Sequence, residues 1–155
     1  MQAPGINPAA GLVEELTAAN SLLKLLEQEQ ACLVEGDVEG LSRLTGEKSG
    51  LVAKMTELAR RRHRTLAAGG FSADESGMKA WLETAGGSHA SWTALLDTAQ
   101  KAKELNRTNG LMIGQQMARN QAALNILQGN QQGSAIYGPN GQSTGSSGSR
   151  RLVIG

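Results

Sequence analysis

Few side chains in this chain of 155 residues have the chemistry and spacing of a catalytic or metal site. The two histidines, His63 and His89, lack the HExxH or HxxxH spacing that would place two imidazoles on one helix face. The single cysteine, Cys32, lies between Ala31 and Leu33 in a helical pattern, with no histidine motif to activate it as a nucleophile. One cysteine also excludes an internal disulfide. We therefore expect no enzymatic activity, no metal site and no cofactor.

One run of basic residues extends from Arg60 to Arg64. Five consecutive helical residues face all round the axis, so the run cannot form a single patch. Its place near the C-terminal end of a predicted helix favours an interaction with the helix macrodipole. Docking of an acidic partner is the alternative. The net charge of +1 argues against general binding of nucleic acid.

The residues most typical of binding lie in the last third of the chain. Residues 105–128 form an amphipathic helical pattern with asparagines set into its apolar stripe. Asn106, Asn109 and Asn120 either fix the register of packed helices or mark a groove that is open to a partner's helix, and the two accounts are compatible. Met112 and Met117 fit the second account, because flexible thioethers adapt to varied surfaces, and the sequence leaves both accounts open.

The only tyrosine, Tyr137, follows this segment within the sequence Ile-Tyr-Gly-Pro. An aromatic residue between an apolar neighbour and a Gly-Pro joint is typical of a short linear motif, which would bind weakly and release readily. The alternative is that Tyr137 folds back onto the helices.

Apolar residues spaced by three and four predict the helices that carry these residues. Aromatic residues are 3% of the chain, so the core must consist of Leu, Ala, Met and Val, which favours packed helices. The predicted fold is all-α: an elongated, left-handed bundle of antiparallel long helices with a disordered C-terminal tail. We expect a helical domain over 1–128, followed by a flexible Gly/Ser-rich tail over 129–155. The expected helices are 9–35, 38–66, 74–85 and 89–128.

The first two helices are expected to form an antiparallel hairpin, and the alternative is one bent helix. Gly36 can end the first helix and Asp37 can cap the second. In a continuous helix, Gly36 and Gly40 together would cost about 2 kcal/mol.

The helical spacing also assigns faces to the predicted helices. The first helix is expected to expose Glu15 and Glu29 to water. The inward stripe of the second passes through Lys48 and Arg62, and that of the last helix passes through Trp92, Leu96, Lys103, Asn106 and Gly110.

The N-terminal sequence has neither the basic region nor the apolar region of a signal peptide. No apolar run approaches the roughly 20 residues that cross a bilayer. We expect a cytoplasmic protein without membrane insertion.

Several strings in the last third resemble one family. Leu105-Asn106-Arg107-Thr108-Asn109-Gly110-Leu111-Met112-Ile113 is followed by Asn120, Ala123-Leu124 and Leu127, and then by Tyr137-Gly138-Pro139-Asn140-Gly141. This pattern resembles the FlgN family of flagellar export chaperones. The resemblance covers roughly residues 10–141, is most specific over 105–141, and carries nothing over to 142–155.

The resemblance implies a cytoplasmic, all-helical protein that is not an enzyme. Members of the family hold the hook–filament junction (hook-associated) proteins, prevent their premature assembly and bring them to the cytosolic domain of the flagellar type III export gate. They bind C-terminal segments of these clients through their own C-terminal amphipathic helix. In this sequence the helix positions are Leu105, Asn109, Met112, Ile113, Gln116, Met117, Asn120, Leu124 and Leu127. The family's gate-docking tyrosine corresponds to Tyr137, in the context of Gly138 and Pro139.

The alternative function is a generic coiled-coil adaptor or regulatory protein without secretion clients. An obligate homodimer of that kind would bury the last helix, whereas a chaperone keeps it accessible. The oligomeric state is left open by the sequence.

Overall fold

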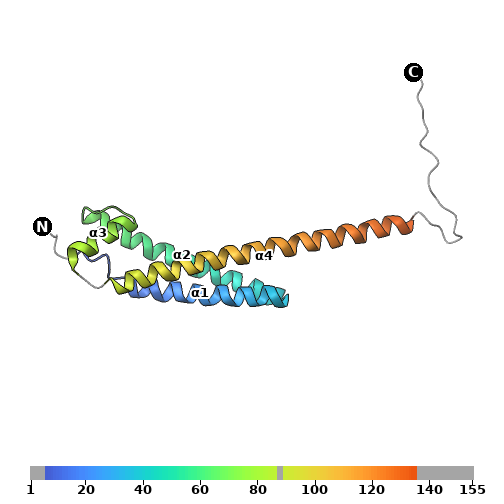
Figure 1. The fold of residues 1–155 in the computed structure, drawn as a ribbon, viewed down its shortest axis with the longest axis horizontal. Helices are drawn as coiled ribbons and strands as arrows, with labels where there is room; N and C mark the ends of the chain where they lie inside the picture. The colour runs from blue at the N-terminus through green and yellow to red at the C-terminus, as the bar shows by residue number, and fades with distance from the viewer. Residues whose placement is uncertain (1–5, 87–88, 136–155) are drawn as a thin grey trace, which may run out of the picture. The chain divides into compact units, whose positions relative to one another are not determined.

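The computed structural model describes residues 6–86 and 89–135, with side chains up to residue 130. This part of the chain contains four helices and no strand: α1 (Leu12–Glu35), α2 (Val38–Ala68), α3 (Glu75–Ala85) and α4 (Ala90–Ala135) (Figure 1). The chain divides into two compact units, Met1–Met112 and Ile113–Gly155. The prediction of an all-α helical bundle is confirmed, and the hand of its supercoil stays a prediction.

The helices α1 and α2 are separate and lie side by side, as expected for a hairpin (Figure 1). Gly36 ends α1 in the left-handed conformation, with φ at 74°, and its N–H donates to the carbonyl of Cys32. The carboxylate of Asp37 accepts from the N–H of Gly40 at 2.9 Å and caps α2. A side chain at Gly40 would displace the capping carboxylate of Asp37 and the sulfur of Cys32, so the absence of a side chain at Gly40 lets the cap form.

The hydrophobic core of the first unit draws on all four helices. Its buried residues are Leu12, Ala19, Leu66, Met78, Leu82, Trp92 and Leu95. Complete burial of a leucine or methionine side chain stabilises a fold by about 1.5–3 kcal/mol. The beginning of α4 is therefore held in the bundle by the same core as α1, α2 and α3.

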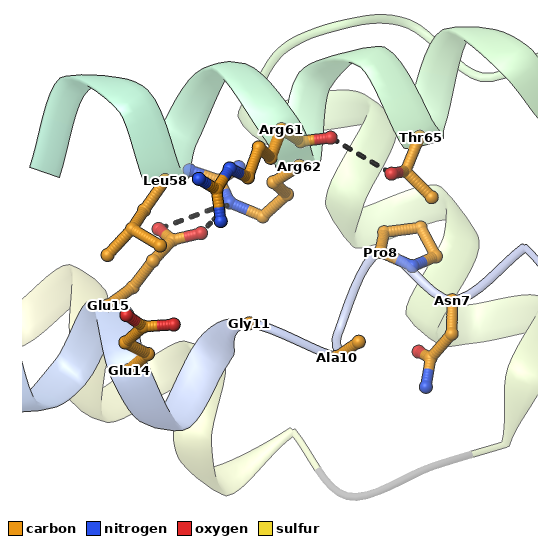
Figure 2. A pocket seen from close by; sticks show the side chains of 10 residues that line it. All are labelled: Asn7, Pro8, Ala10, Gly11, Glu14, Glu15, Leu58, Arg61, Arg62 and Thr65. Carbon is orange, nitrogen blue, oxygen red and sulfur yellow. Dashed lines mark hydrogen bonds and ion pairs between the residues drawn. The ribbon is translucent and has the colours of Figure 1, made fainter. Parts of the chain in front are cut away.

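Two glutamates of α1 do not face water, contrary to the prediction from the sequence. Glu15 and Glu29 are both buried. The Nε atom of Arg62 lies 3.0 Å from Oε1 of Glu15, and Nζ of Lys48 lies 3.3 Å from Oε2 of Glu29 (Figure 2 shows the first pair). The charges that the inward stripe of α2 was predicted to contain, Lys48 and Arg62, are thus neutralised by acids on α1.

The start of α3 is fixed by Asp74. Its carboxylate accepts from the N–H of Gly77 at 2.8 Å and from the hydroxyls of Ser72 and Ser76, each at 2.8 Å. These hydrogen bonds lower the pKa of Asp74 to about 2. α3 ends at Gly86, which is left-handed with φ at 64°.

Two features of α4 differ from the prediction. The buried face is centred on Leu95, Ala102 and Asn109, one position away from the predicted stripe, whereas Leu96, Lys103, Asn106 and Gly110 are exposed. Because apolar residues occupy both neighbouring rows of the helix near its start, the spacing alone does not select between them. The helix also continues to Ala135, so residues 129–135 are helical and not part of a tail. No proline lies between residue 90 and Pro139 to stop the helix, and a glycine inside a helix costs only about 1 kcal/mol.

Candidate functional site

A row of exposed apolar side chains lies on the part of α4 that belongs to the second unit. We call Ile113, Met117, Asn120, Leu124 and Leu127 the α4 stripe. Their spacing of four, three, four and three residues places them on one helix face. The exposed fractions are 37% for Ile113, 66% for Met117, 51% for Leu124 and 59% for Leu127. These side chains form an apolar surface that the described residues do not cover.

The described side chains around the stripe offer no alternative core. From residue 113 to residue 130 every side chain is exposed except that of Gln116, which is half-buried. A helical segment without a buried face gains little from its own packing, so its apolar row is available for an interaction. No acidic residue follows Glu104 in the sequence, and Arg107 and Arg119 are the charged residues between 105 and 130. The segment therefore combines an apolar row with a small net positive charge.

The predicted contact residues that belong to the first unit differ in exposure. Leu105 and Met112 are half-buried, whereas Asn109 is fully buried. The Nδ2 atom of Asn109 donates to the carbonyl of Leu26 at 2.9 Å and to Oε1 of Glu29 at 3.0 Å. Asn109 is thus a structural residue that joins α4 to α1, and its buried side chain is not accessible to a client, contrary to the prediction. This burial supports the interpretation that the asparagine fixes helix register.

The other predicted binding residues, Tyr137, Gly138 and Pro139, lie outside the described residues. Their role in docking stays a prediction from the sequence.

A hollow of about 280 Å³ lies between the segment 7–11, the start of α1 and the C-terminal third of α2 (Figure 2). Its charged lining comprises two glutamates and two arginines, and Glu15 and Arg62 neutralise each other, so the hollow has no net preference for an anion or a cation.

The thiol of Cys32 is half-buried and donates to Oδ2 of Asp37 at 3.8 Å. Burial, together with the carboxylate of Asp37, raises the pKa of this thiol. A raised pKa disfavours the nucleophilic thiolate. Among the residues that the structure describes, no group of three His, Cys, Asp or Glu side chains could hold a metal ion. None of the described helices is long and apolar enough to span a membrane.

The fold and the exposed helix face together define a helical-bundle protein whose last helix presents an uncovered apolar row. Sequence comparison specifies this class further. The family described as FlgN protein matches residues 7–145 of the chain. This match covers most of the sequence, so the chain belongs to the FlgN family, and the resemblance found in the sequence is confirmed.

Individual relatives agree with the family assignment. The flagella synthesis protein FlgN of Salmonella typhimurium strain LT2 is 30% identical over 130 residues, which cover 83% of this chain and 84% of the relative. The protein of the same name from Yersinia enterocolitica is 30% identical over 138 residues, covering 88% of each chain. That of Escherichia coli K12 is 29% identical over 150 residues, covering 94% of this chain and 97% of the relative. No protein of solved structure gives a significant match.

Proposed function

We propose that this protein is a cytoplasmic chaperone of flagellar type III export. It binds the C-terminal helical segments of hook–filament junction proteins, prevents their premature assembly and delivers them to the export gate. Membership of the FlgN family and the names of the relatives, which are flagella synthesis proteins, support this function. The observation that carries the proposal is the uncovered α4 stripe.

The exposed apolar area of the stripe would supply part of the free energy of client binding. A client helix that lies along α4 would cover Ile113, Met117, Leu124 and Leu127, which are about half exposed on average. Complete burial of such a side chain yields about 1.5–3 kcal/mol, so covering the exposed halves of four yields roughly 3–6 kcal/mol before association costs. Further contacts from the client must supply the remainder. Asn120 offers an amide for hydrogen bonds within the apolar row.

The test is client binding by variants with a charge in the stripe. Leu124→Asp and Ile113→Asp each place a carboxylate in the apolar contact, whereas Ala122→Asp places the same charge on the opposite, exposed face of α4. Isothermal titration calorimetry with a purified junction protein should show binding by the Ala122 variant and loss of binding by the other two. Circular dichroism verifies that all three variants fold. Normal binding by correctly folded stripe variants would place the client elsewhere.

Docking at the export gate is a separate part of the proposal and rests on Tyr137, with Gly138 and Pro139 beside it. A tyrosine buries about 150–250 Å² on binding, which is worth about 4–6 kcal/mol before ordering costs. The variant Tyr137→Ala should bind the purified cytosolic domain of the gate more weakly and bind the client as the parent protein does. Equal gate affinity of variant and parent would exclude this role for Tyr137.

The spacing of the stripe also fits a second candidate function, that of a coiled-coil adaptor that pairs with another copy of itself. In such a pair the positions beside the apolar row would be Gly114, Gln116, Gln121 and Ala123. None of these residues is charged, so no ion pair would select a homodimer. Analytical ultracentrifugation distinguishes the two functions, because the adaptor requires a dimer at all concentrations.

A further inference from the structure

The basic run of α2 divides between two faces of the helix. Arg62 points inward, where its guanidinium pairs with Glu15 and lies 4.8 Å from the centre of the Trp92 ring. Arg60, Arg61 and Arg64 are exposed, and His63 is half-buried. The last turn of α2 contains no basic residue. Because the macrodipole acts mainly within the last turn, it does not account for the exposed arginines.

Several of these basic residues line one open hollow. Arg60, His63 and Arg64 belong to the same side of α2, at intervals of three and one residues. The hollow has a volume of about 550 Å³ and lies between α2 and the segment that leads to α3. Its remaining lining residues are Glu57, Ala67 and Ala73. The two alanines leave room for a side chain of a partner beside the guanidiniums.

The positive charge at this hollow is only partly neutralised. Oε1 of Glu57 lies 3.2 Å from Nη2 of Arg64 and 3.5 Å from Nε of Arg61, so one carboxylate serves two guanidiniums. Arg60 forms no ion pair with any residue that the structure describes. An exposed excess of guanidinium groups therefore remains on a chain whose net charge is only +1.

We propose that this hollow, the α2 basic hollow, is a docking site for an acidic polypeptide segment. Carboxylates of the partner pair with Arg60 and Arg64, and an apolar side chain rests on Ala67 and Ala73. The site contains no residue of the α4 stripe, so it is independent of the proposed client surface.

The composition of the hollow favours a polypeptide over nucleic acid. Duplex binding of useful strength commonly involves about 6–10 phosphate contacts. The hollow has two exposed arginines, Arg60 and Arg64, and its lining also includes the carboxylate of Glu57, which would repel a continuous row of phosphates. An acidic peptide can place its carboxylates at the guanidiniums and avoid Glu57.

The test is titration of the full-length, ¹⁵N-labelled protein with a short poly-L-glutamate peptide, followed by nuclear magnetic resonance. The signals of Arg60, His63, Arg64 and Ala67 should shift together and saturate. The double variant Arg60→Ala/Arg64→Ala should weaken this binding about tenfold, since two pairs of exposed charges are lost. The matched control is Arg43→Ala/Lys79→Ala, which removes the same charge from exposed positions on α2 and α3 and should change the affinity less than about twofold.

Three results would overturn the proposal. The first is the absence of saturable shifts at these residues, and the second is an equal loss of affinity in both double variants. The third comes from parallel titrations with a short DNA duplex and with vesicles that contain phosphatidylserine. Tighter binding of either probe at the same signals would assign the hollow to that class of partner. All variants are checked by circular dichroism, and exposed positions are not expected to disturb folding.

Discussion

The buried amide of Asn109 gives the sharpest prediction about stability. Its bond to the carbonyl of Leu26, at 2.9 Å, is worth about 1 kcal/mol, and its bond to the carboxylate of Glu29, at 3.0 Å, about 1.5–3 kcal/mol. Its Oδ1 atom is buried and has no partner among the described residues, so removing this atom offsets about 1–2 kcal/mol of the lost stability. The cavity left by truncation adds roughly 1 kcal/mol. Asn109→Ala should therefore lower the free energy of unfolding by about 3 kcal/mol.

The variant Asn109→Asp tests the direction of the hydrogen bonds. It replaces the donor with a second carboxylate beside Glu29 and opposite the carbonyl of Leu26. Two acceptors then face each other in a buried site, so this variant should be less stable than Asn109→Ala at neutral pH. Acidification that protonates one of the carboxyl groups should narrow the difference.

Urea denaturation followed by circular dichroism measures these free energies. Asn106→Ala is the matched control, because Asn106 is an exposed asparagine of the same helix, and its truncation should change stability by less than about 0.5 kcal/mol. The reasoning is refuted if the Asn109 and Asn106 truncations have equal effects, or if Asn109→Asp is as stable as the parent protein at neutral pH.

Three further predictions concern the bundle. Arg62→Met leaves the carboxylate of Glu15 buried without its cation, so it should lower the free energy of unfolding, measured by urea denaturation, by about 3 kcal/mol. The double variant Glu15→Leu/Arg62→Met should recover a large part of this loss. An unchanged denaturation midpoint for the single variant would contradict the prediction. Gly77→Ala should strongly lower the melting temperature, because its methyl group would collide with the carbonyl of Ser72, and normal melting would show that no such collision occurs. The pKa of Asp74 is lowered from 3.8 to about 2 in the folded protein, so its contribution is present above pH 3.8 and is lost as the pH falls through about 2. Asp74→Ala should therefore flatten the dependence of stability on pH in this window, and an unchanged slope would contradict the assignment.

The sequence was sufficient to predict features that depend on near neighbours. The turn at Gly36 and Asp37 follows from the conformational freedom of glycine and the capping ability of a carboxylate. The apolar spacing of α2 placed Lys48 and Arg62 on the inward stripe. Local chemistry and helical period determine both features.

Features that depend on distant partners were missed. Glu15 and Glu29 were assigned to a wet face because they are acids, but each is paired with a cation on another helix. The sequence signal for this arrangement was the pair of charges within the apolar stripe of α2, each of which requires a buried partner. The sequence also could not decide whether Asn109 is buried or exposed, since its burial depends on how α4 is rotated against α1.

The sequence predicted which apolar residues of α4 share one helix face. Ile113, Met117, Leu124 and Leu127 are exposed and share one helix face, as the spacing indicated. The helix extends past residue 128 because weak propensities, and not a steric stop, govern the segment that follows. The α2 basic hollow was not predicted, since it depends on how the segment before α3 lies against α2.

The most direct test of the central claim is cross-linking at the α4 stripe. A benzoylphenylalanine introduced at Met117 lies within the stripe, and one introduced at Ala122 lies on the opposite exposed face of the same helix. Irradiation of each complex with a purified hook–filament junction protein should yield a cross-link to the client's C-terminal segment from position 117 and none from position 122. Equal cross-linking from both positions, or a stable complex that cross-links from position 122 alone, would contradict the account.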